Sequence, residues 1–333
     1  MHFPTESSVP VTVHHRKTDL PAFLDFPLGP GFHSRVALSF RVPAVLLHSG
    51  TGISNVNPAI FHLGGFELRW YSILFVSGFI IGWFIFKKFF RREGVPEKLL
   101  DPLLYTLLIA TIVGARLGHC LFYQPDYYLT SWKGFAEIFM PWKGGLASHG
   151  GAIALVLAMW WYAAHYGKKY DFDFLWIMDR LVITVCFAGA LIRLGNLFNS
   201  EIYGDVTTLP WGIVFERNGE TLPKHPTQLY EALSYTILGF GLLAAYDKRL
   251  EKLKRGEIFG IFLICLFGIR FLIEFIKEPQ VDFEENMLLD MGQILSIPFI
   301  IAGILLVIYA YKRKIPAQRV PAEKVHHTPK KVR

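Results

Sequence analysis

The chain has 333 residues, of which 52% are apolar and only 18% are charged, and its mean hydropathy is +0.35. Soluble domains carry about 25% charged residues, so this composition excludes a disordered chain and argues against a soluble enzyme. The formal net charge is +7. Because the sequence has no basic nucleic-acid-binding motif, we expect this charge to face anionic membrane lipids and expect no nucleic-acid partner.

Three parts of different composition follow one another along the chain. Residues 1–56 mix Pro, Gly, His and Ser, and we interpret them as a disordered extension or as the product of a start codon placed too far upstream. Residues 57–311 are the expected membrane domain, and residues 312–333 are a basic tail that we expect to be disordered from Ala317. A helix of about 20 residues crosses a hydrocarbon core of about 30 Å. The membrane domain contains seven segments suited to this, at residues 71–86, 102–123, 144–167, 174–193, 228–246, 258–276 and 291–311.

Lys and Arg are distributed unevenly between the two sides of this seven-segment arrangement. The loops and the tail on one side contain 20 of them, whereas the loops at 124–143, 194–227 and 277–290 contain five. Cytoplasmic loops of membrane proteins are enriched in Lys and Arg. The sequence therefore predicts an all-α, polytopic membrane protein with seven transmembrane helices, an external N-terminus and a cytoplasmic C-terminus.

Ionisable and amide side chains lie within or at the ends of these segments, where a charge costs about 2.5–3.5 kcal/mol at the bilayer centre. Asp179 and Arg180 fall in the inner half, and we interpret them as a structural pair. With the predicted orientation the others gather in the outer half, where snorkelling toward basic loops does not explain them. They are Arg116, His119, His149, Arg193, Asn196, Asn199, Glu201, His225, Gln228, Tyr230, Glu231, Arg270 and Glu274.

The chemistry of this outer set favours a phosphate-bearing lipid as ligand. Guanidinium groups bind phosphate through two hydrogen bonds and stay charged in a partly dry site. Arg270 and Glu274 are four residues apart on one helix face, so they are expected either to form a structural ion pair or to share in the site. His149 is interpreted as a general base or, equally, as a hydrogen-bonded packing residue.

Several motifs together resemble the bacterial prolipoprotein diacylglyceryl transferases. The strongest is Arg193-x-Gly195-Asn196-x-Phe198-Asn199-x-Glu201-x-x-Gly204. The others follow the same order as in that family and cover residues 57–311. They are Arg69-Trp70-Tyr71, Gly114-Ala115-Arg116-Leu117-Gly118, Ser148-His149-Gly150-Gly151, His225-Pro226-Thr227-Gln228-Leu229-Tyr230-Glu231 and Arg270-Phe271-Leu272-Ile273-Glu274-Phe275.

The resemblance implies an enzyme of the bacterial cytoplasmic membrane. It implies transfer of the sn-1,2-diacylglyceryl group from phosphatidylglycerol to the lipobox cysteine in the signal peptide of a preprolipoprotein. A thioether forms and glycerol 1-phosphate leaves. The expected partners are therefore phosphatidylglycerol, these signal peptides and the surrounding membrane lipids.

Site residues follow from the matched motifs and from the chemistry of the reaction. The thiol needs a base or a positive field, and the leaving phosphate needs fixed cations. We expect His149 to take the thiol proton and Glu201 and Glu274 to orient the arginines or to replace it as base. The residues expected to bind substrate are Arg193, Arg270, Arg116, Tyr71, Asn196, Asn199 and Gly204. The sequence implies no metal and no organic cofactor, and the acidic residues Asp282, Glu284 and Glu285 are interpreted as solvated.

Three other classes of protein share parts of this pattern. A retinal protein needs a lysine midway along its last helix, and residues 291–311 contain none. A transporter predicts polar residues near the midplane and internal repeats, whereas the polar set lies toward the outer face. A lipid-binding or lipid-flipping protein remains open, because a phosphate pocket alone does not establish a reaction.

Overall fold

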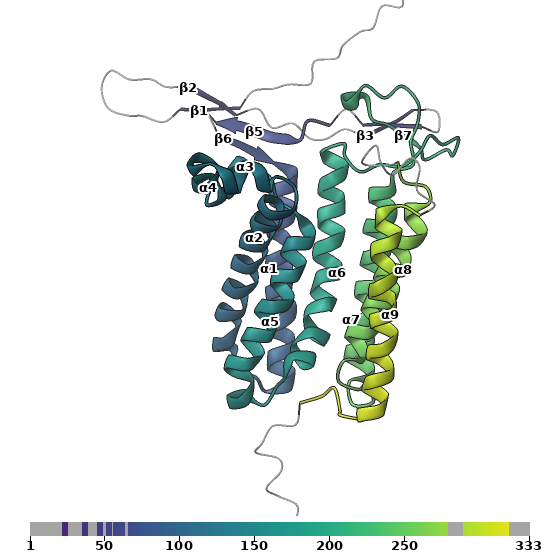
Figure 1. The fold of residues 1–333 in the computed structure, drawn as a ribbon. Helices are drawn as coiled ribbons and strands as arrows, with labels where there is room; N and C mark the ends of the chain where they lie inside the picture. Colours follow the sequence, from purple (N-terminus) through teal and green to yellow (C-terminus); the bar gives the residue numbers. More distant parts are fainter. Residues whose placement is uncertain are drawn as a thin grey trace, which may run out of the picture.

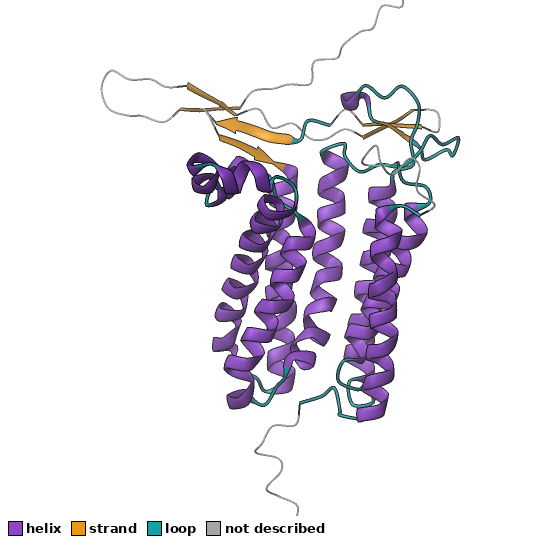
Figure 2. Cartoon of the chain, in the orientation of Figure 1, coloured by secondary structure: helices purple, strands orange, loops and turns teal. Residues whose placement is uncertain are grey.

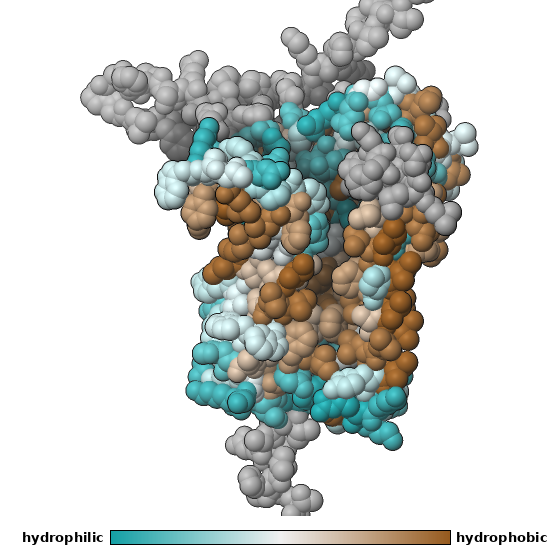
Figure 3. Space-filling model, in the orientation of Figure 1, coloured by the Kyte–Doolittle hydropathy of each residue, from teal (hydrophilic) through white to brown (hydrophobic). Residues whose placement is uncertain are grey.

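The computed structural model describes residues 22–25, 35–38, 45–48, 51–54, 56–63, 66–278 and 289–319 as an upright bundle of long helices (Figures 1 and 2). Within these residues, five helices are long and apolar enough to cross a membrane: α1 (Trp70–Glu93), the stretch Glu97–Phe122 that ends in α2 (Leu100–Phe122), α6 (Phe174–Phe198), α7 (Thr227–Arg249) and α9 (Met291–Arg313). On the face shown in Figure 3, hydrophobic residues cover the middle of the helices and hydrophilic residues cover the end where the basic loops lie. The chain is therefore a predominantly helical membrane protein.

Two further long helices occupy the remaining predicted segments. They are α5 (Ser148–Tyr170) and α8 (Glu257–Glu274), and they run beside the other five (Figure 1). The helix expected from residue 144 begins only at Ser148. Gly144 and Gly145 have φ values of 86° and 70°, in the left-handed region that an α-helix does not use.

Helix α6 lies at the centre of the bundle, between α1, α2 and α5 on one side and α7, α8 and α9 on the other (Figure 1). In the most apolar stretch of 18 residues of α6, 44% is buried inside the bundle, compared with 17% in the corresponding stretch of α9 at the edge of the bundle. Helix α2 packs on α5 and α8 packs on α9. Both of these pairs approach closely through glycines, as small residues allow in membranes: Gly114, Gly118 and Gly150 in the first pair, and Gly260 and Gly303 in the second.

A buried carboxylate, Glu93 at the end of α1, joins four parts of the chain at the basic end of the bundle. It lies 2.7 Å from Arg180 of α6, and Trp176 and Tyr246 donate side-chain hydrogen bonds to it. The backbone nitrogen of Arg319 also donates a hydrogen bond to the carboxylate of Glu93. All these side chains are buried, so the charge of Glu93 is both neutralised and hydrogen-bonded.

The interpretation of Asp179 and Arg180 as a pair was incomplete. Their charged atoms are 3.9 Å apart, but each has a closer partner. Arg180 pairs with Glu93, while Asp179 accepts hydrogen bonds from the backbone nitrogens of Gly256 and Phe259 at 2.7 and 2.9 Å. Asp179 thus satisfies free N–H groups in the first turn of α8 and joins α6 to α8.

The chain after α9 folds back across the basic end of the bundle, and residues 314–319 are named here the C-terminal strap. The backbone nitrogen of Ala317 donates to Leu253, and the carbonyl of Ala317 accepts from Arg180 at 2.8 Å. Arg319 also donates to the carbonyls of Glu93 and Gly94. Disorder was expected from Ala317, but Ala317 is fully buried and Arg319 is 8% exposed. Residues 320–333 lie outside the described residues.

Short strands and helices cover the opposite end (Figure 2), which is called the outer end here after the orientation that the charge distribution predicts. The all-α prediction holds for the bundle but missed these strands. Four of the strands fall within residues 1–56, whose other residues, Val56 excepted, lie outside the described part. The strands are β1 (Ala22–Asp25), β2 (Arg35–Leu38), β3 (Val45–His48), β4 (Thr51–Ser54), β5 (Ala59–Leu63), β6 (Phe66–Arg69) and β7 (Ile213–Val214). The pairs β1–β2, β3–β4 and β5–β6 are antiparallel, and β4 pairs with β7 in parallel. The short helices at this end are α3 (Pro125–Thr130), α4 (Trp132–Ile138), η2 (Pro141–Lys143) and η3 (Glu216–Asn218), whereas η1 (Glu97–Leu99) lies between α1 and α2 at the basic end.

Candidate active site

Arg193, near the outer end of α6, contacts a fully buried carboxylate from α7. Its Nε lies 2.7 Å from Oε2 of Glu231, and the Arg193 side chain is 13% exposed while that of Glu231 is not exposed. The hydroxyl of Tyr235, one turn further along α7, donates to the other oxygen of Glu231 at 3.3 Å. The pair fixes the arginine between α6 and α7 and leaves its terminal nitrogens directed to other partners.

Arg270 of α8 belongs to the same cluster. It interacts with the hydroxyl of Tyr235 and with the carboxylates of Glu231 and Glu274. Arg193 interacts with Tyr235 as well. Arg193 and Arg270 therefore face the same pair of α7 side chains, Glu231 and Tyr235, so that two of the expected substrate-binding residues are brought together from α6 and α8.

The motif that follows Arg193 forms a hydrogen-bonded chain. A terminal nitrogen of Arg193 donates to Oδ1 of Asn196 at 3.2 Å, and Nδ2 of Asn196 donates to Glu201 at 2.7 Å. Asn199 donates to the same oxygen of Glu201 at 3.1 Å. Tyr71 of α1 interacts electrostatically with Glu201 and Arg193. Five of the residues named from the sequence thus form one connected group.

Glycine at position 195 is required by the approach of Tyr71 to α6. A Cβ atom on Gly195 would lie 2.7 Å from a ring carbon of Tyr71, closer than real Cβ contacts allow. Gly204 is in a similar position, because its Cβ would meet the carbonyl of Ile276 and the side chain of Thr227. Both glycines of the motif therefore serve close packing between segments around the arginines; direct contact of Gly204 with substrate stays a prediction.

The loop between these glycines carries unsatisfied polar atoms and strained backbone. Within the described residues, Oδ1 of Asn199 and Oγ of Ser200 on this segment are buried without a hydrogen-bond partner, as is Oε1 of Gln228, whose Nε2 donates to the segment from α7. Ser200 and Ile202 have φ values of 56° and 62°, which is rare for a β-branched residue such as Ile202. Buried unpaired acceptors and strained backbone both concentrate at functional sites.

Glu274 pairs with a different cation from the one expected. Oε2 of Glu274 lies 3.3 Å from Nζ of Lys277, whereas Arg270 interacts with Glu274 without forming an ion pair at contact distance. The carboxylate of Glu274 also lies against Gly292 at the start of α9, where any side chain would collide with it. Its position connects α8 to α9 as well as to the arginine cluster.

Arg116 and His149 lie on the α2–α5 pair. The guanidinium of Arg116 is buried and donates hydrogen bonds to the carbonyls of Glu137, Ile138, Gly144 and Gly145. These contacts hold the loop between α2 and α5; contact of Arg116 with substrate stays a prediction. His149 is exposed, and its ring lies against Phe122 and Tyr123.

No role for Glu231, Tyr235 or Lys277 was predicted from the sequence. Glu231 stood in the set of outer polar residues, and its position one helical turn before Tyr235 was the available signal. Lys277 was counted only as a charge of an outer loop. The acidic residues 282, 284 and 285 lie outside the described residues, as does most of their loop.

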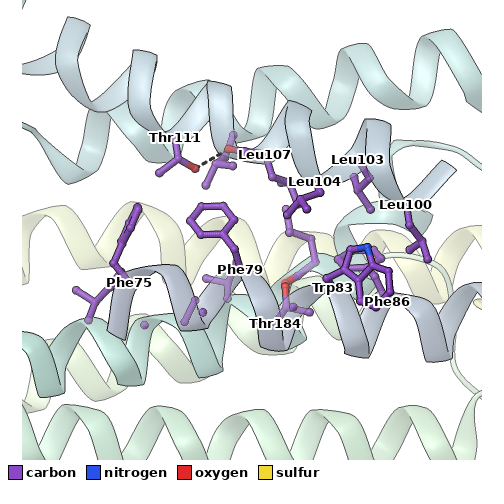
Figure 4. Close-up of a pocket in the computed structure, with 18 residues that line it drawn as sticks. Phe75, Phe79, Trp83, Phe86, Leu100, Leu103, Leu104, Leu107, Thr111 and Thr184 are labelled. Carbon is purple, nitrogen blue, oxygen red and sulfur yellow. Dashed lines mark hydrogen bonds between the residues drawn. The ribbon is translucent and has the colours of Figure 1, made fainter. Parts of the chain in front are cut away.

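An apolar cavity of about 190 Å³ runs beside the cluster, between α1, α2, α5 and α6 (Figure 4). Figure 4 shows Phe75, Phe79 and Trp83 spaced along α1 on one wall and Leu104 and Leu107 of α2 on the other. On α6 the lining reaches Gly189 and Ile192, so the outer end of the cavity lies next to Arg193 in the sequence. The stretch of α1 from Phe75 to Phe86 measures about 16 Å.

Comparisons with known proteins agree with the sequence motifs. The family model for prolipoprotein diacylglyceryl transferase matches residues 58–309. A phosphatidylglycerol–prolipoprotein diacylglyceryl transferase from Tolumonas auensis is 44% identical over 260 residues, which cover 78% of this chain and 98% of the relative. Proteins of the same name from Porphyromonas gingivalis and Cupriavidus pinatubonensis are 45% and 36% identical; each alignment covers 78% of this chain, with 94% and 92% of the relatives. The chain therefore belongs to the prolipoprotein diacylglyceryl transferase family.

Proposed function

We propose that this chain transfers the sn-1,2-diacylglyceryl group of phosphatidylglycerol to the lipobox cysteine of a preprolipoprotein. The thiol sulfur displaces the phosphate oxygen at the glyceryl carbon, so a C–S bond forms as a C–O bond breaks. Glycerol 1-phosphate leaves with one more negative charge than the phosphodiester carried, and the thiol gives up one proton. The observation that carries the proposal is the meeting of Arg193 and Arg270 around Glu231 and Tyr235.

The arginines bind the phosphate of the lipid head in this proposal. Glu231 holds the Nε of Arg193, which leaves the terminal guanidinium nitrogens for a phosphate oxygen. Fixed cations in a site of low dielectric stabilise the charge that develops on the leaving group. Asn196, Asn199 and Tyr71 orient headgroup or glyceryl oxygens, and the unpaired buried oxygen of Asn199 supports this role.

The proton acceptor for the thiol is His149, with Glu201 as the alternative. The ring of His149 is exposed at the outer end of α5, open to an incoming peptide. One oxygen of Glu201 already accepts hydrogen bonds from two asparagine side chains, which hold this carboxylate within the motif. His149 is therefore the better candidate for the first proton transfer.

The apolar cavity receives one acyl chain of the lipid. Its length of about 16 Å along α1 corresponds to one leaflet, half of a hydrocarbon core of about 30 Å. Its polar lining is limited to Thr111 and Thr184, and Thr111 donates its hydroxyl to the carbonyl of Leu107. On α6 the residues that line the cavity end at Ile192. An acyl chain in this cavity therefore places the glyceryl carbon beside Arg193.

Seven helices cross the bacterial cytoplasmic membrane in this proposal, with the N-terminus outside. The support is the distribution of 20 against five basic residues between the two sides, together with the strap and the Glu93 cluster at the basic end. The arginine cluster then lies near the outer face. A preprolipoprotein that is being exported presents its lipobox at that face.

The test is an assay of the purified protein with phosphatidylglycerol and a lipobox peptide, measuring release of glycerol phosphate. We expect stoichiometric release and a thioether-linked product from the wild type. Arg193→Ala should lower the rate by about 100-fold or more, the effect of removing one preorganised charge donor. Arg217→Ala, in an exposed loop, is the matched control.

Binding of the lipid without any release of glycerol phosphate would instead favour a lipid-binding or lipid-flipping protein. Full activity of the Arg193→Ala variant would refute the assignment of the phosphate to the arginines.

A further inference from the structure

Lys277 is a buried cation beside the arginine cluster. It follows α8 directly, and its side chain is only 3% exposed. Its Nζ lies 3.3 Å from Glu274, and it interacts with Glu231, Arg193 and Arg270. A buried lysine is costly unless its charge is used or compensated, so this position calls for an explanation.

The backbone holds Lys277 firmly at this place. Lys277 forms an isolated β-bridge with Gly204. The backbone nitrogen of Asp205, which follows Gly204, donates to the carbonyl of Ile276, which precedes Lys277, at 3.0 Å. The nitrogen of Lys277 itself donates to the carbonyl of Glu274 at 3.2 Å. Because Gly204 closes the motif that begins at Arg193, the ammonium is fixed relative to both ends of that motif.

The charges of the cluster show what Lys277 adds. The four charged groups that interact with Lys277 are Arg193 and Arg270, with two positive charges, and the carboxylates of Glu231 and Glu274, with two negative ones, so these four groups sum to zero. Glu201 is not one of them, and its carboxylate accepts hydrogen bonds from Asn196 and Asn199 instead. Such a set offers no net attraction to an anionic phosphate. Lys277 makes the sum positive by one charge.

We propose that Lys277 is the third cation of the phosphate site and supplies the net positive charge that holds the lipid phosphate and the leaving glycerol phosphate. The proposal rests on the assignment of the phosphate to Arg193 and Arg270. Lys277 acts through its charge and does not take the thiol proton, so an arginine in its place retains the function. The step needs no co-reactant beyond the lipid and the thiol.

The environment of Lys277 also makes this charge sensitive to pH. Burial lowers the pKa of Lys277 from its usual value, and Arg193 and Arg270 lower it further, while Glu231 and Glu274 oppose the change. Asp205, which follows Gly204 on the loop bridged to Lys277, is a further acidic residue, but its side chain is exposed. A lysine is charged below its pKa, so the third positive charge is lost as the pH rises through the lowered pKa, at a lower pH than for an exposed lysine.

The first experiment compares three variants of the full-length protein in the transfer assay, with inhibition by glycerol 1-phosphate as the main measurement. We expect Lys277→Met to weaken that inhibition, and to raise KM for phosphatidylglycerol, by about tenfold, the effect of one lost charge pair of about 1.4 kcal/mol. Lys277→Arg should stay within about threefold of the wild type. Lys224→Met is the matched control, because Lys224 is likewise a buried lysine but pairs with Glu220 and Glu278 instead.

The second experiment needs only folded Lys277→Arg protein. Inhibition by glycerol 1-phosphate is measured between pH 7 and pH 10, where this product is already a dianion. The wild type should lose inhibition as the pH rises, whereas Lys277→Arg should keep it, since a guanidinium stays charged throughout this range. A structural role for Lys277 predicts no such difference.

Three results would overturn the proposal. One is unchanged inhibition in Lys277→Met, another is equal damage in Lys277→Arg and Lys277→Met, and the third is the same pH profile for Lys277→Arg and the wild type. Arg193→Ala, measured in parallel, separates the two proposals. If that variant loses activity while Lys277→Met does not differ from the wild type, only the role of Lys277 fails; if both retain full activity, the phosphate assignment fails as well.

Discussion

Glu231 holds the two arginines of the site near each other and also competes with the substrate for them. Its carboxylate is fully buried, contacts Arg193 at 2.7 Å and accepts from Tyr235. An unpaired carboxylate at this depth would cost several kcal/mol, so both arginines contribute to keeping it charged. Without the carboxylate, two like charges from α6 and α8 would face each other.

Replacement of Glu231 by glutamine should separate binding from turnover. The neutral amide raises the net charge of the cluster by one, so glycerol 1-phosphate should inhibit the Glu231→Gln variant about tenfold more strongly. The rate should fall by a similar factor or more, because Arg193 loses the partner that orients it. Both values come from product-inhibition curves at fixed phosphatidylglycerol. Weaker inhibition in this variant would contradict the charge balance described here.

The pH dependence of the reaction should identify the proton acceptor. If His149 is the base, His149→Gln should remove the acidic limb of the rate profile and lower the rate by about 100-fold. Glu201→Gln should lower the rate without moving that limb. The measurement is the rate of thioether formation between pH 5 and pH 8. The opposite pattern, with the limb lost only in Glu201→Gln, would assign the base to Glu201.

The sequence predicted individual site residues better than it predicted their partners. Arg193, Asn196, Asn199 and Glu201 lie within nine residues, so a single helix end brings them together and the motif was enough. Glu231 and Tyr235 reach them from α7, and this contact depends on the rotation of α7 against α6. Hydropathy defines the length of a helix but sets its rotation only weakly, which is why the pairing of Glu231 was missed.

At the scale of elements, glycines decide how closely α2 and α5 pack. Gly118→Val should therefore destabilise the bundle, because its Cβ would lie 2.7 Å from the Cα of Gly150. Overpacking of this kind costs about 1–3 kcal/mol. The measurement is the melting temperature in detergent, with Gly241→Val as control, since nothing lies within 4 Å of a Cβ at that position. Equal melting temperatures for the two variants would contradict the close contact of α2 and α5.

The cavity between α1 and α6 makes a separate prediction about lipid chain length. Gly82 lines it, and a Cβ there would make an ordinary contact of 3.6 Å with Thr184, so leucine is tolerated but fills the space. Gly82→Leu should lower the rate with long-chain phosphatidylglycerol by about tenfold and leave a short-chain lipid nearly unaffected. The rates of the two lipids are compared directly, with Gly241→Leu as control. An equal loss for both lipids would exclude the cavity as the acyl site.

Hydropathy predicted the positions of the long helices, and each predicted segment overlaps one of them. The predicted helix boundaries were less accurate where the backbone conformation determines where a helix begins, as at Gly144 and Gly145 before α5. The short strands of the outer end were missed. Strands of four or five residues contain too few positions for an alternating pattern to be recognised.

At the scale of the whole molecule, the C-terminal strap connects helices from both sides of α6. Ending the chain after Lys314 removes the hydrogen bonds that Arg319 donates to Glu93, that Ala317 donates to Leu253, and that Arg180 donates to the carbonyl of Ala317. Hydrogen bonds to charged groups contribute about 1.5–3 kcal/mol each. We therefore expect a fall in melting temperature of several degrees, whereas ending the chain after Arg319 should change little.

Thermal unfolding in detergent and limited proteolysis from the basic side report on this prediction together. A truncation after Lys314 that melts with the wild type would show that the strap carries no stability.

The strap and the Glu93 cluster are examples of contacts that cannot be inferred from one sequence. Arg319 and Glu93 are separated by 226 residues, and no local pattern links them. A tail rich in charge and proline has the composition of a disordered segment, so composition gave the opposite expectation. The buried Glu93 carboxylate supplies the reason for order, and only the assembled bundle reveals that it is buried.

The contact between Arg319 and Glu93 also bears on how the protein is made. A ribosome delivers α1 to the membrane long before it has synthesised residue 319, so Glu93 must wait for its last hydrogen-bond donor until translation is nearly complete. During that interval Arg180 is the residue available to neutralise it, and the polypeptide closes the basic end of its bundle only as the nascent chain is released.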